Sequence, residues 1–240
     1  DGTLRAPVHE QLRFSDRTAE AWARRVDDLA DAARVRIGAA VHSVRAVDPG
    51  SIATVAAWAA EHERPLHAHV SEQPAENEQC HAAHGMSPIA LLHSCGALSP
   101  QFSAVHATHV DEADIGLLVA TRSSVCMCPT TERDLADGIA PTDRFRHDGV
   151  AITLGSDSHA VIDLFEEARA VELAERLATG VRGNHRIREL MRAATSDGHR
   201  SLGWSSAGRI DVGAPADLAT VSLRSVRTAG TAARHALAAV

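Results

Sequence analysis

The sequence predicts an α/β fold whose strands form one parallel sheet, and three observations support this prediction. Short apolar stretches alternate with helix-like segments from about residue 35 to residue 200, as they do when crossover helices join parallel strands. Each apolar stretch ends in polar or titratable residues. Such residues gather at the carboxyl ends of the strands in a (β/α)8 barrel, where this fold carries its active site. We therefore expect a partial (β/α)8 TIM barrel, about strands 4–8, with part of a small C-terminal β element.

Periodicity and chain breakers place the individual elements. The expected strands cover residues 37–41, 66–72, 102–109, 124–127 and 150–154. The expected helices cover residues 17–33, 52–62, 88–95, 112–120 and 161–174, with a short helix ending at Gly149 and two further helical segments leading to Gly203. Polar loops are expected at 73–86 and 128–141. A full barrel has more strands than these, so either the sheet is open or its first strands belong to a longer protein. Residues 1–205 form the expected barrel segment, and residues 206–240 form the expected partial β-domain.

Composition narrows the classes of function. The 240 residues carry a formal net charge of -7 and are 45% hydrophobic, which argues against nucleic acid or an anionic membrane as a partner. No apolar run is long enough for a transmembrane helix, and the first residues do not resemble a signal peptide, so we expect a cytoplasmic protein. Lysine is absent, which excludes a Schiff-base lysine, a phosphate-loop lysine and a carboxylated lysine within this chain.

Titratable residues at four strand ends form the candidate site. They are His42 with Arg45, His69 with Glu72, His106 with His109, and Asp157 with His159. Imidazoles combined with a carboxylate suit zinc or iron(II), and such a metal lowers the pKa of a bound water towards about 7. Residues three apart in a regular strand point to opposite faces. His69 and Glu72 can therefore share one site only if the chain leaves the strand around residues 70–71.

Each of these residues also has a purely structural interpretation. The histidines could be solvated side chains at an edge strand, since short motifs carry a high false-positive risk. Asp157 could be a helix N-cap, and Arg45 could form a surface ion pair with Asp48. None of the cysteines forms a C-x-x-C pair, so Cys126 and Cys128 are expected to be packing and loop residues. The recurrence of titratable groups at successive strand ends favours the site over these alternatives.

Several short sequence words together resemble the amidohydrolase superfamily, and within it the formimidoylglutamate deiminase branch. The resemblance runs from about residue 41 to residue 221. The words are His42-Ser43-Val44-Arg45, Leu66-His67-Ala68-His69-Val70-Ser71-Glu72-Gln73, Val105-His106-Ala107-Thr108-His109-Val110-Asp111-Glu112, Cys128-Pro129-Thr130-Thr131-Glu132 with Asp137-Gly138-Ile139, and Gly155-Ser156-Asp157-Ser158-His159.

The resemblance implies an activity and a role for each site residue. It implies hydrolytic deamination of N-formimidoyl-L-glutamate to N-formyl-L-glutamate and ammonia, as in histidine degradation, at one zinc ion. His69 and Asp157 would be zinc ligands, and Asp157 would also take a proton from the attacking water. Glu72 would shuttle a proton to the imino nitrogen, and His106 would stabilise the tetrahedral centre. His42 and Arg45 would bind the glutamate part, since a guanidinium suits a carboxylate. A homodimer is compatible with this interpretation. Iron is the alternative metal.

The chain departs from the superfamily pattern in one important respect. The first-strand His-x-His pair, which supplies two metal ligands in the superfamily, has no counterpart here, and His67 is not counted as a ligand. Because two ligands hold zinc weakly, we expect the 240 residues alone to be inactive. Two other functions stay open. One is a deaminase of the same superfamily acting on a heterocycle such as guanine or cytosine, and the other is a metal-free binding module.

Overall fold

A five-stranded parallel sheet forms the centre of the computed structural model, which describes residues 8–158 and 161–238. The strands follow one another across the sheet in chain order, and each neighbouring pair is parallel. They are β1 (Ala39–Val41), β2 (Leu66–Val70), β3 (Phe102–His106), β4 (Ser124–Met127) and β5 (Ala151–Leu154). This order confirms the predicted fold class, because it is the order of consecutive strands in a (β/α) barrel.

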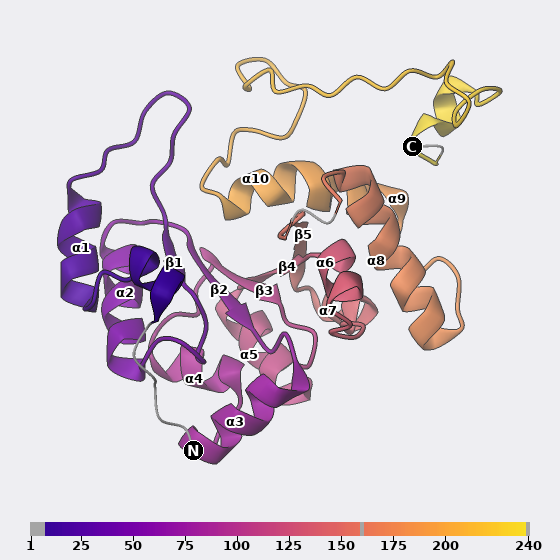
Figure 1. Cartoon of the computed structure of the whole chain (residues 1–240). Coiled ribbons are helices and arrows are strands. Elements are labelled where there is room, and N and C mark those ends of the chain that lie inside the picture. The colour runs from indigo at the N-terminus through magenta and orange to yellow at the C-terminus, as the bar shows by residue number, and fades with distance from the viewer. Residues whose placement is uncertain (1–7, 159–160, 239–240) are drawn as a thin grey trace.

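Helices lie in the connections between the strands, before β1 and after β5 (Figure 1). They are α1 (Ala19–Asp27), α2 (Pro49–Glu61), α3 (Pro74–His84), α4 (Pro88–Ser94), α5 (Glu112–Thr121), α6 (Pro129–Asp134), α7 (Thr142–Asp148), α8 (Leu164–Thr179), α9 (Ile187–Arg192) and α10 (Gly198–Ser201), with short turns η1 (His9–Phe14), η2 (Ala193–Asp197) and η3 (Ala233–Ala238). Asp48 and Asp111 cap α2 and α5 by accepting the backbone N–H of Ser51 and Asp114, which satisfies donors that have no partner inside the helix. Within the described part of the chain, no helix is long and apolar enough to cross a membrane.

The two faces of the sheet differ because side chains alternate along each strand. One face packs on helices that contact one another in the order α2, α4, α5, α7 and α8, and its side chains are buried. The fully buried members of this core include Ile52, Leu92, Phe102, Leu118 and Phe145. The register aligns His69, Val105, Cys126 and Thr153 in one row across the opposite face. The opposite face therefore carries His69, one of the candidate site residues. The helices that pack on the other face hold the strands in place.

Two segments expected to be polar loops contain helices. Helix α3 begins at Pro74 and α6 begins at Pro129, and proline is favoured in the first turn because its missing N–H would have no helical partner there. Helix α3 has only a weak apolar stripe, and α6 is short, so apolar periodicity does not reveal either of them.

The C-terminal β element expected within residues 206–240 is not formed in the described part of the chain. Residues 202–232 make turns and irregular segments, and no strand is assigned to them. Figure 1 shows this tail running away from the sheet, so its backbone groups have no neighbouring strand to pair with, and a strand needs such a partner. A domain boundary near residue 205 stays a prediction.

Gly208 anchors the start of this tail, and its substitution is expected to destabilise the protein. Gly208 and Gly213 have φ values of +72° and +82°, which cost an L-residue about 1 kcal/mol. A Cβ on Gly208 would lie 2.6 Å from the backbone of Thr195 and Ser196, whereas one on Gly213 would meet nothing within 4 Å. We expect Gly208→Ala to lower the free energy of unfolding in urea by about 1–3 kcal/mol more than Gly213→Ala. Equal losses would show that the steric contact at Gly208 is unimportant.

Candidate functional site

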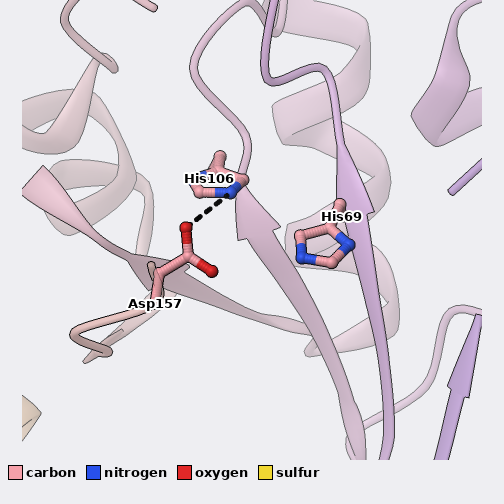
Figure 2. A group of neighbouring side chains, drawn as sticks. All are labelled: His69, His106 and Asp157. Atoms are coloured by element: carbon pink, nitrogen blue, oxygen red, sulfur yellow. Dashed lines mark ion pairs between the residues drawn. The ribbon is translucent and has the colours of Figure 1, made fainter. Parts of the chain in front are cut away.

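Three side chains meet beyond the carboxyl ends of the strands. One ligand atom from each of His69, His106 and Asp157 lies within 4.8 Å of the others, close enough to share a metal ion. Figure 2 shows the three converging from β2, from β3 and from the segment that follows β5. They are far apart in sequence, and the parallel sheet brings them together because all its strands end at the same edge.

The backbone turns sharply where these residues leave their strands. Ser71, His106 and Asp157 have φ values of +51°, +70° and +43°, in a region that non-glycine residues rarely adopt. The turn at Ser71 confirms the expectation that the chain leaves β2 at residues 70–71, and it allows His69 and Glu72 to face one site. Such strained residues cluster at functional sites in proteins.

His69 is oriented by the strand beside it. Its Nδ1 donates to the backbone carbonyl of His42 at 2.7 Å, so Nε2 is the ring nitrogen left to bind a metal. A histidine ligand commonly donates its other N–H in this way, which fixes its tautomer and raises its basicity. The His69 ring stacks on the His106 ring with centroids 5.7 Å apart.

His106 lies at the centre of the cluster and is fully buried. Its Nδ1 is 3.2 Å from Oε1 of Glu132, and its Nε2 is 3.7 Å from Glu72 and 3.9 Å from Asp157. Burial opposes a positive charge on the ring, but the hydrogen bond and charge of Glu132, helped by Glu72 and Asp157, outweigh it and raise the pKa of His106. The Nε2 atom is buried without a hydrogen-bond partner, as expected of an atom that faces a ligand site.

Arg45 belongs to the site rather than to the surface. Its Nη2 donates to Glu72 at 2.8 Å, and its Nε lies 3.7 Å from the buried carboxylate of Glu76. Burial raises the pKa of Glu76, and the positive charge of Arg45 opposes that shift. The alternative pairing with Asp48 is not formed, because Asp48 caps α2 instead. The guanidinium already binds one carboxylate at the rim of the cluster.

The other candidate residues are placed less centrally. Nδ1 of His42 lies 3.0 Å from the hydroxyl oxygen of Ser43, and the centroid of the His42 ring is 5.3 Å from that of the His69 ring. Partial burial lowers the pKa of His42, as do the nearby His69 and Arg45. His109 donates from Nε2 to the backbone carbonyl of Asp137 at 2.6 Å, so that ring fixes a loop. His159 lies outside the described residues.

Asp157 and the two cysteines of β4 also have defined surroundings. The N-cap of α8 is Asp163, so Asp157 does not cap that helix. Sγ of Cys128 donates to the backbone carbonyl of Cys126 at 4.0 Å, and the interaction between the two neighbouring thiols lowers the pKa of Cys126 and raises that of Cys128. Both thiols lie beside Gly155, where an added Cβ would be 3.3 Å and 3.2 Å from their sulfurs. They pack beneath the turn that carries Asp157.

Sequence reasoning assigns no role to Glu132, although this residue contacts His106 directly. It was visible only as the last residue of the word Cys128-Pro129-Thr130-Thr131-Glu132. Its burial, with the whole residue 5% exposed, could not be read from a segment expected to be a polar loop. A carboxylate five residues after the end of β4, next to buried threonines, was the available signal.

The donor set of the cluster fits a zinc ion. Imidazole nitrogen and carboxylate oxygen are both ordinary zinc ligands, and the cluster offers two of the first and one of the second within 4.8 Å. Glu72 and Arg45 add a carboxylate and a guanidinium at the rim. Together they can hold a metal, move a proton and bind a carboxylate.

Comparison with known proteins finds one matching family and several similar proteins. The sequence profile of the Amidohydrolase family matches residues 3–238. The chain is 36% identical over 197 residues to the formimidoylglutamate deiminase of Pseudomonas aeruginosa, covering 78% of this chain and 43% of that protein. It is 34% identical over 202 residues to the 5-methylthioadenosine/S-adenosylhomocysteine deaminase of Halobacterium salinarum, covering 83% and 46% respectively.

A solved structure agrees with the sequence comparisons. An adenosine deaminase from Xanthomonas campestris with bound zinc matches with a TM-score of 0.82 at 27% sequence identity, covering 88% of this chain and 50% of that chain. The chain therefore spans about half the length of the relatives that it matches.

His67, which lies two residues before His69 on the same face of β2, is expected to make the stability of the protein depend on pH. Its Nε2 donates to the Ser201 carbonyl at 2.9 Å, and burial lowers the pKa of His67. As the pH falls below about 6.5, the unfolded chain therefore takes up this proton before the folded one, and stability is lost. His67→Gln removes the titration, so the variant should lose less unfolding free energy on acidification, by up to about 1.4 kcal/mol per pH unit. Urea denaturation from about pH 7.5 to 5.5 measures this, and parallel pH curves would contradict it.

Proposed function

Because the chain belongs to the Amidohydrolase family, we propose that it forms the catalytic half of a deaminase that converts N-formimidoyl-L-glutamate to N-formyl-L-glutamate and ammonia. The observation that carries this proposal is the cluster of His69, His106 and Asp157, with Glu72 and Arg45 at its rim. The similarity to the formimidoylglutamate deiminase of Pseudomonas aeruginosa supports this substrate.

His69 and Asp157 would hold the zinc ion, with iron(II) as the alternative metal. When bound there, the ion supplies a Lewis acid and lowers the pKa of a neighbouring water towards about 7. The bond from His69 Nδ1 to the His42 carbonyl supports this role, because it directs Nε2 to the metal side. Other ligands would come from outside this chain, which covers only 43% of that relative.

The remaining side chains handle protons and charge. In the proposed reaction Asp157 accepts a proton from the attacking water, and Glu72 delivers a proton to the imino nitrogen. Asp157 then passes its proton to the same nitrogen while Glu72 takes the hydroxyl proton of the tetrahedral centre, so that ammonia leaves and the formyl C=O forms. The Nε2 atom of His106 faces both carboxylates at 3.7 Å and 3.9 Å, and it stabilises the charge that develops on the tetrahedral centre. A positioned acid or base typically contributes about 10²–10⁴-fold to the rate.

Arg45 is the residue proposed to select the substrate. The formimidoyl substrate carries the carboxylates of glutamate, and a guanidinium binds a carboxylate through paired N–H donors. In the structure Arg45 binds the Glu72 carboxylate at 2.8 Å while its side chain stays 32% exposed, so a substrate carboxylate can reach it. His42 is the neighbouring group proposed to bind the same part of the substrate.

A second candidate function is deamination of a purine nucleoside. The 34% identity to a 5-methylthioadenosine/S-adenosylhomocysteine deaminase favours it. 5-Methylthioadenosine has no carboxylate, so its recognition has no need of a guanidinium at Arg45. S-Adenosylhomocysteine carries a carboxylate, so 5-methylthioadenosine is the substrate that separates the two functions at this residue.

Replacement of Arg45 distinguishes these two substrates. In a protein of the relatives' full length, Arg45→Met should lower kcat/KM for formimidoylglutamate by about 30–150-fold, because a charge-assisted hydrogen bond of about 2–3 kcal/mol is lost. Most of this loss should be in KM, measured by ammonia release. Arg122→Met is the control, since Arg122 lies at the far end of α5 and should change neither constant.

The contrary outcome is also clear. Turnover of 5-methylthioadenosine in place of formimidoylglutamate, with no loss in the Arg45 variant, would refute the proposed substrate. The 240-residue chain, assayed in parallel with added zinc, is expected to release no ammonia because two zinc ligands are too few for tight binding.

A further inference from the structure

Glu132 is a buried carboxylate that the proposed reaction does not use. It lies in the first turn of α6, the helix that follows β4, and its side chain is 6% exposed. Its Oε1 accepts the backbone N–H of Cys128 at 2.9 Å and lies 3.2 Å from Nδ1 of His106. Burying a carboxylate costs several kcal/mol unless its partners compensate, so these contacts need an explanation.

We propose that Glu132 is a positioning residue that holds His106 with the Nδ1 proton towards itself and with Nε2 facing the substrate. The proposal rests on the proposed function for the part played by Nε2. The orientation of the ring is a separate matter that the contacts of Glu132 determine. The proposal thereby assigns a role to Glu132, the last residue of the Pro-Thr-Thr-Glu word.

The contacts of His106 show why one partner decides its orientation. Among the described residues, Glu132 is the group that hydrogen-bonds to this side chain, while Nε2 has no partner. A neutral imidazole carries its proton on either nitrogen, and the hydrogen bond made by one nitrogen selects which. A carboxylate accepts but cannot donate, so Glu132 requires the proton on Nδ1. That leaves Nε2 on the side of Glu72 and Asp157, at 3.7 Å and 3.9 Å, where the second proton of a charged ring makes it a donor to the developing charge.

A second buried carboxylate provides a matched control. Glu167 of α8 is fully buried and accepts both the backbone N–H and the hydroxyl of Thr130, at the start of α6. Glu167 binds the first turn of α6, as Glu132 does, but among the described residues no hydrogen bond or ion pair joins Glu167 to His106. Loss of Glu167 should therefore affect the stability of α6 without changing the proton position on His106.

Glu132→Gln separates positioning from packing. Glutamine has the same shape, and its carbonyl oxygen can still accept the Cys128 N–H, so the fold should change little. The same oxygen still faces Nδ1 of His106, but it lacks the negative charge that strengthens this hydrogen bond, so the preference for a proton on Nδ1 is weakened. A residue that only packs would show no such change.

Nitrogen NMR of the imidazole rings in this chain tests the proposal without any turnover. Two-bond ¹H–¹⁵N spectra report which ring nitrogen carries the proton, and His106→Asn identifies the His106 signals. We expect a protonated Nδ1 in the wild type and in Glu167→Gln, and a population protonated only on Nε2 in Glu132→Gln. A bare Nδ1 in the wild type, or an unchanged ring in Glu132→Gln, would overturn the proposal. The wild-type result decides even if a variant fails to fold.

Kinetics in a protein of the relatives' full length give the second readout. Glu132→Gln should lower kcat by about 10–100-fold, the usual effect of losing the residue that orients a site histidine, with KM unchanged. Glu167→Gln should keep kcat and instead lower the melting temperature. If the wild type fails to deaminate formimidoylglutamate while the NMR result holds, the substrate assignment is wrong and the positioning of His106 stands.

Discussion

Three backbone turns, at the ends of β2, β3 and β5, are the constraint on which the site depends. Ser71, His106 and Asp157 all take left-handed φ values, and each such residue costs of order 1–3 kcal/mol. A regular strand would send Glu72 to the face opposite that of His69. The apolar helix layer on the other face of the sheet stabilises the strands enough to hold these strained residues in place. The site is therefore a product of the packing behind it as much as of its own side chains.

The charged groups of the site lie next to groups of opposite charge. Arg45 lies between the carboxylates of Glu72 and Glu76, and His106 lies among Glu132, Glu72 and Asp157. Removing one member of such a set would leave another buried without compensation, which is the expensive case. The acidic groups outnumber the basic ones around His106, so a bound cation would relieve the excess of negative charge. This balance joins the electrostatics of the cluster to its proposed metal.

Much of the fold and part of the site could be predicted from the sequence. The five strands were predictable because each is a short apolar stretch that ends in polar residues, and the parallel order then brings His69, His106 and Asp157 together. Helices α3 and α6 were missed because their polar residues hide the helical period. The role of Glu132 was missed because its burial depends on α8, which packs against α6 from a distant part of the sequence. The expected C-terminal β element did not form because a strand needs a neighbour that the sequence alone does not locate.

The central claim is that imidazole and carboxylate groups from separate strands bind one cation. X-ray absorption at the zinc edge, on a protein of the relatives' full length carrying one zinc ion, tests it most directly. The account predicts only nitrogen and oxygen neighbours at about 2.0–2.2 Å, with an imidazole contribution that is reduced in His69→Ala. Sulfur neighbours at about 2.3 Å, which would come from Cys126 and Cys128, or a spectrum that His69→Ala leaves unchanged, would contradict it.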